Sequence, residues 1–123
     1  MTNRELLELA AKAAGIEIEW NVMINHNSPI LATKTQQERN WLGHEHTPWN
    51  PLSDDGDALR LAVKLELDLY NSCISVRAIH RDRDTGTSIK CRGSNPRMDP
   101  NAATRFAIVR AAAEIGKSME VKL

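Results

Sequence analysis

The segment 99–116 constrains the fold of this chain more than any other part of its sequence. Asp99 is a favoured N-cap residue, and Pro100 at the first helical position has no backbone donor to leave unpaired. Apolar residues, many of them alanine, then recur at helical spacing in two adjacent stripes: Ala102, Phe106, Ile108, Val109, Ala112, Ala113, Ile115 and Met119. The sequence therefore predicts a C-terminal helix whose small side chains let it approach a sheet closely.

Two further helices are predicted from their capping residues. Thr2 and Glu5 form a capping box, in which each side chain satisfies a free backbone donor of the first turn, and Gly15 closes this helix. The other helix begins near Ser53, and three aspartates within the next four residues suit the positive end of the helix dipole. Because these aspartates lack the spacing of a calcium-binding loop, helix capping explains them better than a bound cation does.

Alternating apolar and polar residues predict several short strands. One strand is expected at 16–20, with a short return strand at 30–33. A hairpin is expected from a long strand at 69–80 and a second strand at 87–92, joined by a turn at 82–86. These elements give a short antiparallel sheet.

The hairpin sets which residues are expected to share a face or to pair. On the long strand, Tyr70 is expected on the same face as Ala78. Cys91 should face a residue near Arg77, which leaves Cys73 about four residues, or on the order of 13 Å, away. A disulfide does not span that distance, so both cysteines are expected to be reduced thiols.

The order of the predicted elements indicates an α+β fold. We expect a three-layer α/β/α-type sandwich, with about three helices and a short antiparallel sheet in a single domain, 1–123. The composition, 41% hydrophobic and 26% charged residues, is typical of one globular domain. No apolar run reaches the roughly 18 residues of a membrane span, and the N-terminus lacks a signal-peptide pattern. A cytoplasmic protein without a membrane partner is therefore predicted.

Three segments of the chain resemble the phage ABA sandwich domain family. They are 4–15, 49–65 (WNPLSDDGDALRLAVKL) and 99–116 (DPNAATRFAIVRAAAEIG). The resemblance implies a helix–sheet–helix fold and an origin in a tailed phage or prophage, hence a location in the host cell cytoplasm. It implies no catalytic residues. The segments 21–48 and 81–98 depart from the family pattern, so we expect them to carry the function of this particular protein.

The longest irregular segment, 34–52, contains part of a candidate binding site. Trp49 lies in the family-like motif and is expected in the core, whereas Trp41 is the better functional candidate. Aromatic rings stack on bases, and Arg or His side chains hold phosphate groups. The candidate ligand- or partner-binding residues are Trp41, His44, His46, Arg77, His80, Arg81 and Arg83.

No catalytic residue set, metal site or cofactor is predicted. His44 and His46 offer two imidazoles, whereas zinc usually has three or four protein ligands. Asp84, in an Asp-Thr-Gly tripeptide, follows charged residues instead of the apolar ones that bury the paired carboxylates of aspartic proteases, so we interpret it as a hairpin turn. Cys73 and His80 lie too far apart along a strand to act as nucleophile and base.

We therefore predict a non-enzymatic accessory binding protein of a phage or prophage. As a counter-defence factor, it would inhibit a host protein or sequester a nucleotide signal. The alternative is a small enzyme that hydrolyses a nucleotide or phosphodiester through His44, His46 and His80. Nucleic-acid binding is a further alternative, which the formal net charge of zero disfavours. The oligomeric state stays open, and a homo-oligomer is compatible with the sequence.

Overall fold

The computed structural model of the chain describes six stretches of residues: 2–21, 28–31, 49–72, 75–81, 88–93 and 99–121. Its helices there are α1 (Asn3–Ala14), α3 (Asp55–Lys64) and α4 (Pro100–Val121). Its strands there are β1 (Ile18–Asn21), β2 (Ser28–Leu31), β3 (Asp68–Asn71), β4 (Val76–Arg81) and β5 (Ser88–Arg92). Helices mixed with antiparallel strands confirm the predicted α+β class.

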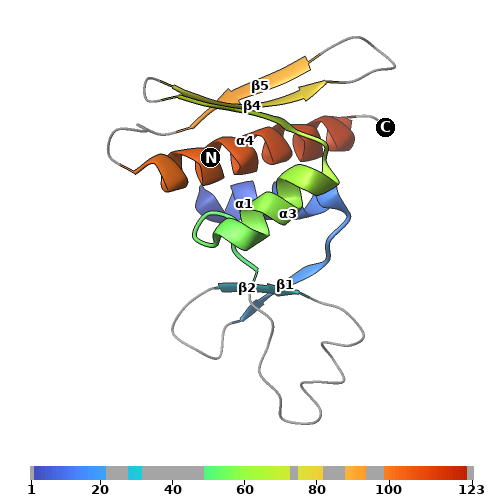
Figure 1. Cartoon of the computed structure of the whole chain (residues 1–123). Helices are drawn as coiled ribbons and strands as arrows, with labels where there is room; N and C mark the ends of the chain where they lie inside the picture. Colours follow the sequence, from blue (N-terminus) through green and yellow to red (C-terminus); the bar gives the residue numbers. More distant parts are fainter. Residues whose placement is uncertain are drawn as a thin grey trace.

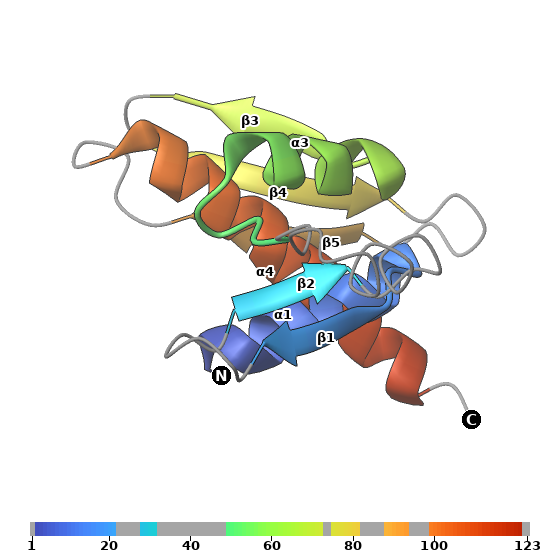
Figure 2. The same ribbon diagram turned by 90° about the horizontal axis from the view of Figure 1, so that it is seen from below.

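The layers are stacked in a different order from the one expected. Helix α4 packs against β4 and β5 on one side and against α1 and α3 on the other (Figure 1). Within the described residues, all three helices therefore lie on the same side of the β3–β4–β5 sheet, and the predicted arrangement with the sheet in the middle is not seen. The β1–β2 ribbon lies beyond α1, on the side away from α4 (Figure 1), and Figure 2 shows the ribbon from below.

The β3–β4–β5 sheet is antiparallel throughout, with β4 in the centre. The predicted strand over 69–80 is wrong, because a turn divides it into β3 and β4. Ser72 and Ser75 form this turn: the Ser72 backbone N–H donates to the Ser75 carbonyl at 3.0 Å, and the Ser72 hydroxyl accepts from the Ser75 N–H at 2.9 Å. Tyr70 consequently pairs with Arg77, on the opposite face from Ala78.

The second half of the hairpin is close to its predicted register. Cys91 pairs with Ala78, one residue beyond the expected Arg77, and it is a free, buried thiol as predicted. Cys73 lies outside the described residues. A shift of one residue matters in a strand because it exchanges the two faces of the sheet.

Helices α1 and α4 pack closely against each other. Helix α1 shows the Thr2 half of the predicted capping box, in which the Thr2 hydroxyl accepts from the Glu5 N–H at 3.2 Å. Gly15 closes the helix as predicted, in the left-handed region at φ 69°. A Cβ added to Gly116 of α4 would lie 2.1 Å from the Leu9 carbonyl oxygen of α1. Only a residue without a side chain fits there. No helix in the described ranges is both long and apolar enough to cross a bilayer.

The alanines of α4 allow it to pack closely both against the β3–β4–β5 sheet and against α1. The fully buried residues of this helix are nearly all small: Ala103, Ala107, Val109, Ala111, Ala112 and Ala113. They face different sides of the helix, so α4 is buried around most of its circumference instead of along one stripe. The sequence predicted one close partner, a sheet, and the structure adds α1 as a second.

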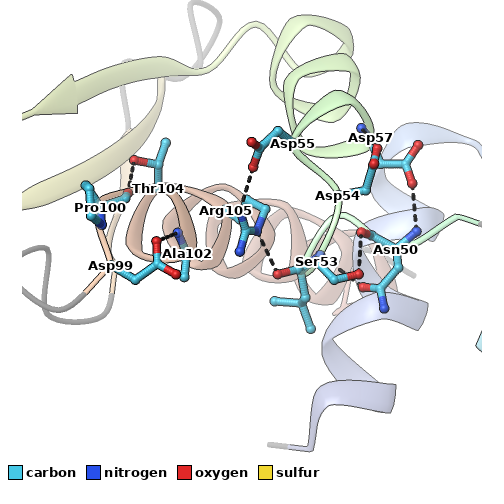
Figure 3. A network of polar contacts seen from close by, with 11 residues as sticks. Asn50, Ser53, Asp54, Asp55, Asp57, Asp99, Pro100, Ala102, Thr104 and Arg105 are labelled. Carbon is cyan, nitrogen blue, oxygen red and sulfur yellow. Dashed lines mark hydrogen bonds and ion pairs between the residues drawn. The ribbon is translucent and has the colours of Figure 1, made fainter.

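A polar network joins the start of α3 to α4 (Figure 3). Asp54 caps α3 by accepting from the Asp57 N–H at 2.8 Å, and buried Asp57 accepts from the Asn50 N–H at 2.8 Å. From α4, Arg105 donates to the Leu52 carbonyl at 2.9 Å and forms an ion pair with Asp55. The three aspartates therefore serve capping and ion pairing, which accounts for them without a bound cation.

The apolar side chains near this network are of two kinds, buried in the core or exposed on the outer side of α3. Trp49 is 4% exposed and belongs to the core, as predicted. Leu59 and Val63, by contrast, are 59% and 68% exposed on the outer side of α3. No described element covers that side of the helix, whereas Ala58 and Leu61 are buried in the core.

Candidate functional site

The outer face of the β3–β4–β5 sheet, turned away from α4, is rich in cations. Alternation along each strand and the pairing register place the same eight residues on this face: Asp68, Tyr70, Arg77, Ile79, Arg81, Ser88, Lys90 and Arg92. Four of them are basic and one is acidic. The opposite face carries Val76, Ala78 and Cys91, all buried on the α4 side. Figure 1 shows no described helix over the outer face.

A hollow of about 420 Å³ lies where this face meets the edge of β5. Its lining consists of four cationic residues and one thiol: Arg77, Lys90, Cys91, Arg92 and Arg110. Arg110 belongs to α4 and reaches the edge of β5, where its Nη1 donates to the Arg92 carbonyl at 3.2 Å. No acidic residue is among the described residues that line the hollow. Four cations in one concave place favour an anion, and guanidinium groups match the geometry of phosphate oxygens.

Arg77 lies at the centre of the outer face and contacts an aromatic ring. Its guanidinium carbon is 5.0 Å from the centre of the Tyr70 ring, which remains 56% exposed. Its Nε is buried and has no hydrogen-bond partner within the described part of the chain. A buried donor without an acceptor is unfavourable by about 1–3 kcal/mol. Within the described residues, Arg77 therefore has no acidic partner that neutralises its charge.

Arg81, at the other end of β4, is balanced by a carboxylate. Its Nε lies 2.7 Å from Asp68 Oδ2 on β3, and both side chains are more than half exposed. Exposed ion pairs of this kind contribute little to stability, with a median of about 0–1 kcal/mol. An incoming phosphate would therefore displace Asp68 at small cost.

The structure brings together some of the predicted site residues and separates others. Arg77 and Arg81 lie on the same outer face, two pleats apart. His80 alternates with them, so it lies on the face that carries Val76 and Ala78, and it does not join an arginine cluster. The remaining candidates, Trp41, His44, His46 and Arg83, lie outside the described residues.

Four residues of the site were missed by the sequence analysis: Tyr70, Lys90, Arg92 and Arg110. Lys90 and Arg92 alternate with Ile89 and buried Cys91, and this period of two was a usable signal for an exposed basic face. Tyr70 was assigned to the wrong face because the turn at 72–75 was not predicted. Arg110 became part of the site through tertiary packing, which no local pattern reveals.

The thiol in the hollow is not activated. Burial raises the pKa of Cys91 above its ordinary value, and Glu114 on α4 raises it further, while the positive charge of Arg110 opposes both effects. A nucleophilic cysteine needs the opposite shift, toward the thiolate. Within the described residues, no three His, Cys, Asp or Glu side chains are grouped so that they could hold a metal ion.

A second hollow, also of about 420 Å³, is apolar and lies between α3 and β3. Its exposed apolar side chains are Leu59, Val63 and Leu69, and Glu66 and Asp68 line it as well. Most of the lining of this hollow is apolar. Exposed leucine and valine side chains close together are typical of a surface that contacts another protein.

Comparison of the chain with protein families, curated proteins and solved structures finds no match. The function therefore has to be argued from the geometry of the outer sheet face and its hollow.

Proposed function

We propose that this chain is a non-enzymatic binding protein that holds a phosphate-bearing ligand of the nucleotide class on its outer sheet face. The observation that carries the proposal is the hollow lined by Arg77, Lys90, Arg92 and Arg110 without a described carboxylate. Phosphate groups form charge-assisted hydrogen bonds with such cations, and these are the strongest hydrogen bonds available to a protein surface.

The aromatic ring beside the cations points to a nucleotide instead of a simple anion. Tyr70 and Arg77 are direct neighbours across two strands, which puts a stacking surface roughly 5 Å from a phosphate-binding group. A base on the ring and a phosphate on the cations use both features together. The raised pKa of Cys91 disfavours a nucleophilic role for the thiol that lines the hollow, because burial favours its protonated form.

The biological role that we propose for this binding rests on the resemblance to phage ABA sandwich proteins. A phage or prophage accessory protein in the host cytoplasm would use the basic face to sequester a nucleotide signal as a counter-defence factor. The membership in that family, the cytoplasmic location and the counter-defence role stay predictions.

The proposal is tested by titrating the ¹⁵N-labelled protein with pyrophosphate and with ATP, using adenosine as the uncharged control. We expect both anions to shift the amides of β5 and of Arg77, and adenosine to leave the cation-lined residues unchanged. The double variant Lys90→Gln/Arg92→Gln should lose these shifts, because it removes half of the cations from the hollow. Lys64→Gln, an exposed change on α3, is the matched control and should bind normally. A folded protein whose β4 and β5 amides respond to neither anion contradicts the proposal.

A second function, binding of a host protein, is favoured by the apolar hollow between α3 and β3. Its exposed Leu59 and Val63, with acidic residues at the rim, suit an apolar partner surface edged by basic side chains. Leu59→Ser/Val63→Ser should abolish such a protein contact and leave ATP titrations unchanged. A variant that still contacts its protein partner with unaltered affinity removes this role for the hollow.

A further inference from the structure

We infer that the ligand of the outer sheet face is a single-stranded nucleic acid, bound through its backbone phosphates and through a base stacked on Tyr70. This inference rests on the proposed function, since it takes the phosphate-binding hollow as given. It adds that the ligand is a polymer and that its bases are unpaired.

The first argument is the shape of the site. Small ligands are normally held in concave pockets that bury roughly 70–90% of their surface. Here the cations stand on a sheet face that no described helix covers (Figure 1), and a hollow lies at its β5 edge. A mononucleotide held in the hollow would leave Arg81, which does not line it, without a ligand contact. A polymer gains from several weak contacts along an open face, so the geometry favours a chain of phosphates.

The second argument is the spread of the positive charge. Arg77 and Arg81 lie four residues apart on β4, about 13 Å along the strand, and Lys90 and Arg92 lie one strand away on β5. Arg110 adds a cation at the sheet edge. Positive charge is therefore offered at successive places across the face, with the hollow at one end and the weakly held Asp68–Arg81 pair at the other. One terminal phosphate group does not reach both ends.

The third argument is the exposed aromatic ring. Tyr70 is 56% exposed, and the Arg77 guanidinium lies 5.0 Å from the centre of its ring, so that an exposed aromatic ring stands beside a positive charge. Every base has a face that stacks on such a ring, whatever its identity. In a duplex the bases are already stacked on each other and the ring gains nothing. The ring beside the cations therefore favours a single strand and predicts little sequence preference.

Fluorescence anisotropy of fluorescein-labelled 12-nucleotide oligo(dT) and oligo(U), measured from about 50 to 300 mM KCl, tests this inference. Release of counterions from a single strand lowers log K by about 0.7 per log unit of salt for each phosphate contact. With three or four contacts we expect a slope of about −2 to −3. Lys90→Gln should reduce this slope by about 0.7, whereas the Lys64→Gln control should leave it unchanged.

The stacking contact has its own matched pair of variants. Tyr70→Ala should weaken binding about tenfold at every salt concentration without changing the slope, because the lost contact is uncharged. Tyr70→Phe keeps the ring and should bind like the wild type. Equal affinity of Tyr70→Ala and the wild type would overturn the stacking role.

The outcomes separate this inference from the proposed function. If ATP binds as tightly as the oligonucleotides, the ligand is a mononucleotide, and the polymer inference fails while the proposed function stands. If a duplex of the same length binds as tightly as the single strand, unpaired bases are not recognised and the inference fails. If neither ATP, pyrophosphate nor any oligonucleotide binds the folded protein, both proposals fall. A difference between oligo(dT) and oligo(U) identifies which nucleic acid is the source of the phosphates.

Discussion

Substitution of Gly116 by alanine tests the close packing of α1 on α4. At an exposed helical position this change would stabilise the protein by roughly 0.8–1 kcal/mol, because alanine is the better helix former. At Gly116 the new Cβ would lie 2.1 Å from the Leu9 carbonyl oxygen and 2.8 Å from its carbon, whereas ordinary contact begins near 3.4 Å. Both obstructing atoms belong to the backbone of α1, so no side-chain rotation relieves the clash.

The magnitude follows from the separation that the two helices must undergo. They have to move apart by about 1 Å, and a gap of that size forfeits a quarter to a half of the dispersion energy across an interface. Overpacking of this kind typically costs about 1–3 kcal/mol, and an interface between backbones belongs at the upper end of that range. After the gain in helix propensity, we expect a net destabilisation of about 2 kcal/mol.

Urea denaturation followed by circular dichroism measures this change, and thermal melting checks it. A loss of about 2 kcal/mol corresponds to a fall in Tm of roughly 8 °C for a domain of this size. The matched control is Gly56→Ala in α3, where the atoms nearest to the added Cβ are side-chain atoms of Arg60 and Asp54, at 3.2 Å. That variant should be as stable as the wild type or more stable by up to about 1 kcal/mol, because no backbone clash opposes the gain in helix propensity. If Gly116→Ala is as stable as the wild type or more so, α1 and α4 do not pack this closely.

Three further changes test the polar network and the buried thiol. Arg105→Ala should lower the free energy of unfolding by about 2 kcal/mol in the urea assay, because this side chain is only 16% exposed and joins α4 to α3. The exposed control Arg4→Ala should lower it by less than about 0.5 kcal/mol. Equal losses for the two variants would count against the network. Asp57→Ala should lower the free energy of unfolding by about 1–3 kcal/mol, because the Asn50 N–H loses its acceptor. An unchanged Tm in thermal melting would show that water replaces the Asp57 carboxylate as acceptor. Burial raises the pKa of Cys91 above 9.0, so the protonated thiol stabilises the fold at neutral pH, and this stabilisation is lost as the pH rises through the raised pKa. The difference in the free energy of unfolding between the wild type and Cys91→Ala should therefore shrink above pH 9. A difference that stays constant with pH refutes the shift.

The sequence predicted the helices of the fold well because their ends have chemical markers. Helix N-caps are occupied by residues whose side-chain oxygen accepts from the first turn: Thr2, Asp54 and Asp99. The C-cap of α1 is Gly15, which adopts the left-handed conformation without a steric penalty. Such signals are local, so they can be recognised without knowledge of the tertiary structure. The stacking order of the layers has no local marker. It depends on how many faces of α4 are covered, and alanine side chains permit either a sheet or a helix as neighbour.

The candidate site was predicted only in part, because the face on which a strand residue lies depends on register. Arg77 and Arg81 were chosen as phosphate-binding residues, and both lie on the basic face. His80 was grouped with them from its position in the sequence, although alternation along β4 separates it. Tyr70 was missed because the apolar pattern continues across the turn at 72–75. Serine residues mark a turn less clearly than Gly or Pro residues do.

The charge of the basic face also determines how the whole molecule behaves in an electric field. The five charged residues of the outer sheet face are four cations and one anion, whereas the other described residues carry seven basic and eleven acidic side chains. A formal net charge of zero thus conceals an uneven distribution of charge over the described part of the chain, with the positive excess on the sheet. Near a polyanion such a molecule turns the sheet toward it before contact and keeps its helices behind, so that encounters are pre-oriented although no net attraction exists at long range. At low salt, the same asymmetry makes the protein adsorb to cation exchangers near its pI of about 6.9.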